Sequence, residues 1–173
     1  MIVLICGLSG AGKTTLAENV RNKLVAIGKA TEILDGDEYR KMLFKELSYS
    51  QEDRFENIRR LGFIGNKFSK QGIIAIVSAI NPFEEIRQEL CRNYDDVKIV
   101  SLYCPVEILI ERDTKGLYAR ALLPDGHPQK LYNLTGINDR FDVPENPDLY
   151  LDSGTQSVKE CTDILFDFII ERC

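Results

Sequence analysis

Residues 7–15, GLSGAGKTT, constrain the fold more than any other part of the chain. They follow the apolar run Ile2–Cys6 and precede a helical pattern, which is the strand–loop–helix setting of a Walker A phosphate-binding loop. Glycines let such a loop turn its N–H groups toward phosphate oxygens, and the helix that follows adds the positive end of its dipole. The loop therefore predicts that the chain binds a nucleoside triphosphate.

The parts of this loop have different predicted roles. Lys13 is expected to contact the β- and γ-phosphates of ATP and to be catalytic, and the Thr14 hydroxyl is expected to bind Mg²⁺. The residues of the loop predicted to bind ATP, the co-substrate, are Gly7, Ser9, Gly10, Ala11, Gly12, Lys13, Thr14 and Thr15.

Apolar runs alternate with helical patterns along the chain. Further buried strands are expected at 30–34, 73–78, 97–103 and 149–152, and helices at about 13–27, 50–71, 83–92, 105–112 and 157–172. Buried strands separated by helices are typical of a parallel sheet that is covered on both faces. We therefore predict an α/β fold of the P-loop NTPase type: one three-layer αβα domain over 1–173, with about five parallel strands. Residues 113–146 lack apolar periodicity and predict a mobile, partly helical lid.

Composition excludes several classes of protein. The net charge of −5 argues against a nucleic-acid surface, and no apolar run approaches the roughly 20 residues of a membrane span. Because the chain begins at its first strand, no targeting segment is expected and a cytoplasmic protein is predicted. Five scattered cysteines and a single histidine predict neither disulfides nor a zinc site.

Two carboxylates, Asp35 and Asp37, flank a glycine where the second strand ends. A carboxylate at this edge of the sheet faces the phosphate loop, where it can hold Mg²⁺ or take the proton of an attacking hydroxyl. We predict Asp35 to be catalytic and, with Thr14, to bind the metal. The alternative is that the Asp-Gly-Asp sequence only satisfies the geometry of a turn.

Basic side chains form a second group of candidates. Arg54 and Asn57 share one face of a predicted helix, and Arg40 precedes them; guanidinium groups bind phosphate or sulfate through two parallel hydrogen bonds. The alternative for these residues is a solvated helix face with ion pairs to neighbouring acids. The stretch RDTKGLY, 112–118, predicts a positively charged lid that closes over ATP, or else an ordinary exposed loop.

Read together, seven strings resemble one family. The strings GLSGAGKTT, LDGDEYR, SQEDRFENIRR, GIIAIVSAINPF, RDTKGLY, LTGI and PENPDLYLD occur in the order found in adenylylsulfate kinases, which are P-loop kinases. The resemblance implies transfer of the γ-phosphoryl group of ATP to the ribose 3′-hydroxyl of a 5′-modified nucleotide, and a homodimer. It places Asp35 at the reacting hydroxyl and Arg112 on the ATP side. Residues that it assigns to the acceptor are Asp37, Arg40, Tyr49, Arg54, Asn57, Ser78, Ile80, Lys115, Leu117, Leu134 and Ile137.

The departures from this family lie on the acceptor side. Members hold adenine between two aromatic rings; Tyr49 keeps one ring, whereas Leu134 replaces the other. Stacking of a base on an aromatic ring is worth roughly 1–3 kcal/mol, so one lost ring weakens adenine binding by about tenfold or more. Asn81 stands where many members have a serine, and residues 122–130 resemble an insertion.

These departures leave two acceptors open. One is adenylyl sulfate, and the other is a 5′-modified pyrimidine nucleotide such as cytidine diphosphoramidate, which serves bacterial capsule modification. A third alternative is a non-catalytic nucleotide-binding module. Against it stands the presence of Lys13, Thr14, Asp35 and the arginines together, since a degenerate module is expected to have lost some of them.

Overall fold

Five parallel strands form the central sheet, in the spatial order β2-β3-β1-β4-β5. The computed structural model describes residues 1–173. Its strands are β1 (Ile2–Cys6), β2 (Thr31–Asp35), β3 (Ile74–Ser78), β4 (Val97–Tyr103) and β5 (Leu149–Asp152). Because parallel neighbours cannot be joined by a tight hairpin, each connection crosses over through at least one helix. The parallel sheet of about five strands is confirmed.

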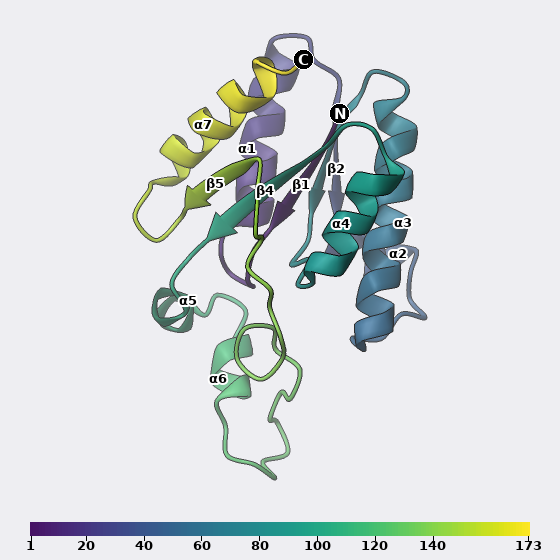
Figure 1. Cartoon of the computed structure of the whole chain (residues 1–173). Coiled ribbons are helices and arrows are strands. Elements are labelled where there is room, and N and C mark those ends of the chain that lie inside the picture. Colours follow the sequence, from purple (N-terminus) through teal and green to yellow (C-terminus); the bar gives the residue numbers. More distant parts are fainter.

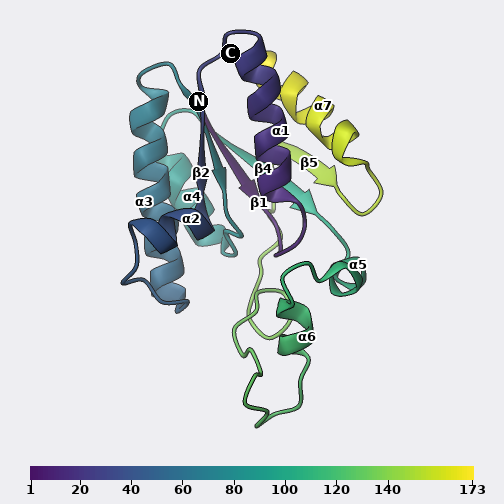
Figure 2. The same cartoon turned by 180° about the vertical axis from the view of Figure 1, so that it is seen from behind.

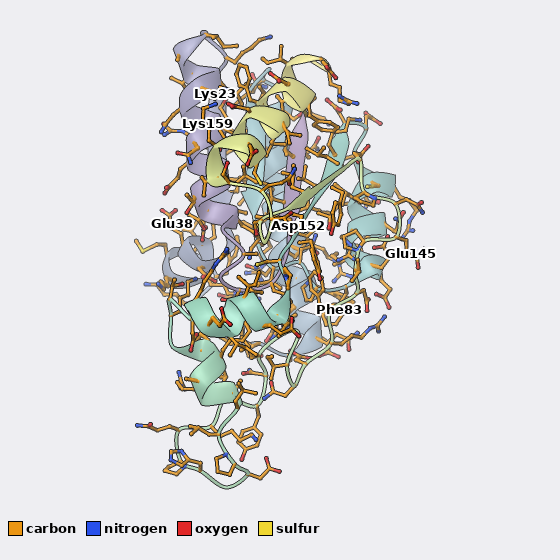
Figure 3. The ribbon with its side chains drawn as sticks, turned by 90° about the vertical axis from the view of Figure 1, so that its left-hand side faces the viewer. Lys23, Glu38, Phe83, Glu145, Asp152 and Lys159 are labelled. Carbon is orange, nitrogen blue, oxygen red and sulfur yellow. The ribbon has the colours of Figure 1, made fainter.

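Helices cover both faces of the sheet (Figures 1 and 2). Helices α1 (Lys13–Ala26) and α7 (Val158–Ile170) lie on one face, and α3 (Gln51–Ser69) and α4 (Glu84–Asn93) lie on the other. On the first face, Asp163 of α7 accepts hydrogen bonds from Lys23 of α1 and Lys159 of its own helix, at 2.7 and 2.6 Å, and these two lysines lie close together in Figure 3. The three-layer αβα prediction is confirmed.

Strand β1 has an apolar residue at every position because both faces of the sheet are covered. In β1, Val3 and Ile5 pack into the core beneath α1 and α7, whereas Ile2 and Leu4 pack into the core beneath α3 and α4. Successive side chains of a strand point to opposite faces, so one strand contributes to two cores.

Local signals set the ends of the helices. The sequence Ser50-Gln51-Glu52-Asp53 predicts a helix start capped by Ser50, and the Ser50 hydroxyl does accept a hydrogen bond from the Asp53 N–H at 3.2 Å. Ser157 forms a capping box with Glu160 at the start of α7.

Helix α3 carries the apolar stripe that its sequence predicts, and this stripe packs into the core beneath α3 and α4: Phe55, Ile58, Leu61, Ile64 or Gly65, and Phe68. Its buried face is centred on Ile58 and Leu61, and it includes two glycines that stand close to α4 and the sheet.

The carboxyl edge of the sheet carries the remaining short helices: α2 (Gly36–Met42), α5 (Val106–Arg112) and α6 (Leu117–Ala121). The predicted lid, 113–146, contains α6 and otherwise turns and irregular chain, and it lies beyond the carboxyl ends of β1 and β4 (Figure 1). Its Tyr118 and Leu134 are buried. The lid is therefore docked onto the domain by apolar contacts, and its mobility stays a prediction. None of the helices is both long enough and apolar enough to cross a bilayer.

Candidate active site

The Walker A loop surrounds a cavity of about 250 Å³ at the carboxyl end of β1. Gly10 and Gly12 have φ values of 80° and 95°, in the left-handed region that glycine enters at low cost. Gly7 is needed for a different reason than the turn of the loop, because a Cβ atom there would stand 2.3 Å from the Leu102 carbonyl oxygen. Gly7 thus allows the loop to leave the sheet in contact with β4, while Gly10 and Gly12 provide its curvature.

Lys13 lines this cavity, which we call the phosphate cavity. Its Nζ donates a hydrogen bond to the Leu8 carbonyl oxygen at 2.7 Å, within the loop that it belongs to. Burial lowers the pKa of Lys13 to about 8, against the opposing charge of Asp37 and, more weakly, of Asp35. The negative charge around the ammonium group is therefore too weak to offset its burial, as suits a site for an anionic ligand.

Thr14, Asp35 and Ser78 bring three side-chain oxygens together beside the phosphate cavity. The Thr14 hydroxyl donates to Asp35 Oδ2 at 2.8 Å and lies 3.5 Å from Ser78 Oγ. The other carboxylate oxygen of Asp35 accepts from the N–H groups of Asp37 and Glu38, so Asp35 also caps α2. The turn alternative is therefore correct in that Asp35 caps α2, and the same cap fixes the carboxylate that faces Thr14; its catalytic role stays a prediction. Oxygen ligands of this kind suit Mg²⁺.

Two contacts fasten the lid to the rest of the site. Lys115 Nζ donates to Asp37 Oδ2 at 2.9 Å, and the buried Tyr118 hydroxyl donates to the Ser9 carbonyl oxygen at 2.8 Å. Burial raises the pKa of Asp37, but the hydrogen bond and charge of Lys115, helped by Lys13 and a neighbouring lysine, hold it below the usual value. The same hydrogen bond raises the pKa of Lys115. Tyr118 was not among the predicted site residues, although the string KGLY contains it.

A larger cavity of about 630 Å³ lies between the lid and the α2–α3 region. Of the predicted residues, it is lined by Ser9, Asp37, Arg40, Tyr49, Arg54, Ile80, Lys115, Leu117 and Leu134. Lining residues that were not predicted are Lys41, Leu47, Arg120, Leu131, Asn133 and Thr135. Asp37 and Ile80 also line the phosphate cavity, so the two cavities adjoin. We call the larger one the acceptor cavity.

A smaller cavity of about 50 Å³ adjoins the acceptor cavity on the side of β3, and we call it the side cavity. It brings in Asn57, together with Arg40, Tyr49 and Arg54, which line both. Arg40, Arg54 and Asn57, predicted as one constellation, therefore do converge. Ile137 does not join them; it packs against the core beneath α1 and α7 and lines neither cavity.

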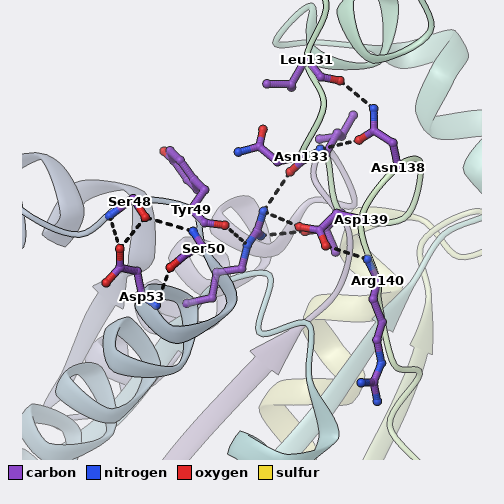
Figure 4. A network of polar contacts seen from close by, with 12 residues as sticks. Ser48, Tyr49, Ser50, Asp53, Leu131, Asn133, Asn138, Asp139 and Arg140 are labelled. Carbon is purple, nitrogen blue, oxygen red and sulfur yellow. Dashed lines mark hydrogen bonds and ion pairs between the residues drawn. The ribbon is translucent and has the colours of Figure 1, made fainter. Parts of the chain in front are cut away.

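Arg54 is buried rather than placed on a solvated helix face, with 7% of its side chain exposed. Its guanidinium donates to Tyr49 O at 2.9 Å, to Thr135 Oγ1 and Asn133 O at 2.8 Å each, and pairs with Asp139 at 3.0 Å (Figure 4). The alternative of ion pairs with acids on its own helix is therefore wrong for this residue. Arg54 joins α3 to the lid, and the sequence carried no signal for these distant partners.

The two residues predicted to flank the acceptor base differ in exposure. Tyr49 is 56% exposed, and its ring centroid lies 5.0 Å from the Arg40 guanidinium carbon, whereas Leu134 is buried. Both line the acceptor cavity. The two residues that the resemblance assigns to the base therefore line one cavity, and their contact with a base stays a prediction.

On the other side of the Walker A loop, a cavity of about 270 Å³ is lined by Gly12, Thr15 and Arg112. Gly12 and Thr15 also line the phosphate cavity, so the two cavities adjoin at the loop. Arg112 Nη2 donates to the Ser153 carbonyl oxygen at 3.3 Å, and Ser153 Oγ donates to the Ala11 carbonyl oxygen at 2.9 Å. This geometry suits the predicted role of Arg112 on the ATP side, while Ser153 was missed.

The family model for adenylylsulphate kinase matches residues 1–152. The chain belongs to the adenylylsulfate kinase family. Among curated relatives, adenylyl-sulfate kinase of Chloroflexus aurantiacus is 43% identical over 165 residues, covering 95% of this chain and 86% of its own. That of Synechococcus sp. JA-3-3Ab is 40% identical, covering 94% and 90%. As a member of this family, the chain is a phosphotransferase that acts on an alcohol group.

Solved structures agree with this assignment. A structure of the Mycobacterium tuberculosis APS kinase CysC in complex with AMPPNP and APS is 33% identical, with a TM-score of 0.89 over 98% of this chain and 96% of that one. A sugar kinase from Janibacter, at 19% identity and a TM-score of 0.68, shows only that the fold is shared. The P-loop kinase fold is confirmed. The pyrimidine alternative finds no support among these relatives.

Proposed function

We propose that this chain transfers the γ-phosphoryl group of ATP to the ribose 3′-hydroxyl of adenylyl sulfate. The observation that carries the proposal is that three cavities adjoin one another along one edge of the sheet. The Arg112 cavity and the phosphate cavity share Gly12, and the phosphate cavity and the acceptor cavity share Asp37 and Ile80. Such a row accommodates two nucleotides whose phosphate and sugar ends meet at Asp35, and relatives at about 40% identity are adenylyl-sulfate kinases.

On the ATP side, this chain's residues bind and neutralise the triphosphate. The N–H groups of the Walker A loop and the dipole of α1 face the β- and γ-phosphates, with Lys13 among them. Thr14 and Asp35 would hold Mg²⁺, which would supply positive charge against the negative charge of the triphosphate. Ser78 Oγ lies close enough to Thr14 Oγ1 to join this set of oxygen ligands.

On the acceptor side, catalysis rests on position and charge. Asp35, fixed by its role as the cap of α2, orients the 3′-hydroxyl and accepts its proton. Arg40, Arg54 and Asn57 hold the acceptor beyond its sugar, and Tyr49 and Leu134 enclose the base. Lys115 approaches from the lid to Asp37 and adds positive charge near the transferred group.

The assay is ADP release, coupled to a dehydrogenase, with ATP and one acceptor at a time. Adenylyl sulfate is expected to give a kcat/KM above about 10⁴ M⁻¹s⁻¹, as ordinary enzymes do, and Lys13→Ala is expected to lose orders of magnitude in kcat. Turnover of cytidine diphosphoramidate alone would refute the proposed acceptor. ATP binding without turnover of any acceptor would identify a non-catalytic module.

The base pocket has its own test. Leu134→Phe restores a second ring beside Tyr49, so the preference for adenine over pyrimidine acceptors is expected to rise by about tenfold, given roughly 1–3 kcal/mol for each stacked base. An unchanged preference would place the base elsewhere. The homodimer and the cytoplasmic location stay predictions from the sequence, and light scattering of the purified chain tests the first.

A further inference from the structure

Asp113 lies between α5 and α6, where the chain passes into the lid (Figure 1). One of its carboxylate oxygens accepts a hydrogen bond from the Tyr118 N–H at 3.0 Å, and the other accepts one from the Ala119 N–H at 2.8 Å. The residue at the N-cap position of α6 is Gly116, which has no side chain to receive these groups. Asp113 therefore provides, from outside the helix, the acceptors that the start of α6 lacks.

The backbone of Asp113 adopts a conformation that costs free energy. Its φ of 21° and ψ of 49° lie on the left-handed side, where few residues other than glycine, asparagine and aspartate are found. Its N–H donates to the Leu109 carbonyl oxygen, and its own carbonyl oxygen accepts from the Gly116 N–H, both at 2.9 Å. Residues 113–116 thus form a tight turn that Asp113 closes with its main chain and its side chain. Conformations of this kind are concentrated at functional sites.

The tip of this turn belongs to the phosphate cavity. Thr114 and Lys115 both line that cavity, and Lys115 Nζ donates to Asp37 Oδ2 at 2.9 Å. The side chains of Lys115 and Asp37 are 57% and 60% exposed, so their ion pair contributes little to holding the turn in place. The hydrogen bonds of Asp113 are therefore the main constraint on where the turn places Lys115.

Backbone N–H groups keep the Asp113 carboxyl ionised. Desolvation raises its pKa, but hydrogen bonds from the N–H groups of Ala119, Tyr118 and Leu117 hold the pKa of Asp113 below its usual value. Hydrogen bonds to an ionised acceptor are stronger than those between neutral groups. A carboxamide at this position would keep only one acceptor oxygen, because its NH₂ group is a donor.

We propose that Asp113 is a positioning residue for phosphoryl transfer, which fixes the 113–116 turn so that Lys115 reaches the phosphate cavity. Asp113 lines neither the phosphate cavity nor the acceptor cavity, so it acts through Lys115 and not by contact with a substrate. The proposal rests on the proposed function for the reaction that Lys115 assists. Without the carboxylate, the turn samples other conformations, and the ammonium group is in place for a smaller share of the time.

The test is a double-mutant cycle in kcat with ATP and adenylyl sulfate, in which Lys115→Met is the second change. Asp113→Gly tolerates the same backbone conformation but has no carboxylate, so kcat is expected to fall by about tenfold. In the Lys115→Met background, the same change is expected to lower kcat by less than about twofold, because no ammonium group remains to be positioned.

Two further variants complete the experiment. Asp113→Asn keeps one acceptor oxygen and is expected to lie between the wild type and Asp113→Gly in kcat. Asp125→Asn is the matched control, because it removes an equal charge from an exposed part of the lid, where Asp125 pairs with Lys130. Its kcat is expected to stay within about twofold of the wild type.

A purely structural role would give a different pattern. If the carboxylate only stabilised the lid, Asp113→Gly would lower the unfolding midpoint and leave kcat unchanged, or would lower kcat by the same factor with and without the Lys115 side chain. Either result would overturn the proposal. An Asp113→Asn enzyme less active than Asp113→Gly would overturn it as well, since one retained acceptor should help.

Failure of the proposed function is recognised separately, because the wild type itself would then not turn over adenylyl sulfate. In that case the same cycle is run on the dissociation constant of ATP with Mg²⁺, measured by calorimetry without an acceptor. A loss of affinity of about fivefold in Asp113→Gly that disappears in the Lys115→Met background supports the proposal. Equal losses in both backgrounds, or no loss in either, overturn it.

Discussion

Tyr118→Phe tests whether one hydrogen bond holds the lid against the Walker A loop. The Tyr118 hydroxyl donates to the Ser9 carbonyl oxygen at 2.8 Å, and only 2% of the residue is exposed. Burial raises the pKa of Tyr118 to about 12, so the hydroxyl remains a donor across the working range of pH. Removing it forfeits the hydrogen bond and leaves a buried carbonyl without a partner, which together cost about 1–2 kcal/mol.

If this hydrogen bond positions the lid for catalysis, its loss lowers kcat/KM. A loss of about 1–2 kcal/mol corresponds to a factor of roughly 5–30, so kcat/KM for ATP is expected to fall by that factor. Steady-state kinetics and thermal unfolding are measured on the same preparations. Tyr150→Phe is the matched control, because Tyr150 is exposed on β5 and its ring stacks on Tyr103. A Tyr118→Phe enzyme within twofold of wild type in kcat/KM would refute this reasoning.

Three further outcomes are expected. Burial lowers the pKa of Lys13 to about 8, and a bound phosphate favours the charged form, so ATP binding at pH 9 takes up a proton. Calorimetry in two buffers of different ionisation enthalpy measures this uptake, which Lys13→Arg should abolish. In urea-induced unfolding, Gly65→Ala is expected to raise the free energy of unfolding by about 1 kcal/mol, because alanine has the higher helix propensity. Gly62→Ala is expected to have a lower free energy of unfolding than Gly65→Ala, because its methyl group would meet Leu90 Cδ2 at 2.6 Å. Equal free energies of unfolding for the two variants would contradict this. Lys115→Met leaves the unfolding midpoint unchanged, because its ion pair is exposed, but lowers kcat; an unaffected kcat would exclude Lys115 from the phosphoryl-transfer site.

Features that depend on neighbours in the chain were predictable. The apolar runs marked the strands to within about a residue, Ser50 marked the start of α3, and the glycines marked the Walker A loop, because each is a local pattern with a local physical cause. The same holds for Asp35: the end of a strand beside the phosphate loop was enough to place it next to Thr14. The edge of the sheet at which the site lies was predictable too, because ligands of parallel sheets bind at the carboxyl ends of the strands.

Features that depend on distant partners were not predictable in this way. The apolar stripe of α3 was predicted, but the burial of Gly62 beside it depends on Leu90 of α4, which periodicity alone does not register. Ile137 was assigned to the acceptor by its place in a string, yet it packs into the core.

The sequence by itself determined that a triphosphate-binding loop stands at the edge of a parallel sheet, since strand, turn and helix there are set by residues within a few positions of one another. Only the tertiary structure decided how the acceptor side is built. Arg54 meets Asn133 across 79 residues of sequence and Tyr118 meets Ser9 across 109. Such contacts exist only once the sheet has assembled and the lid has folded back over it, because no local preference brings their donors and acceptors together.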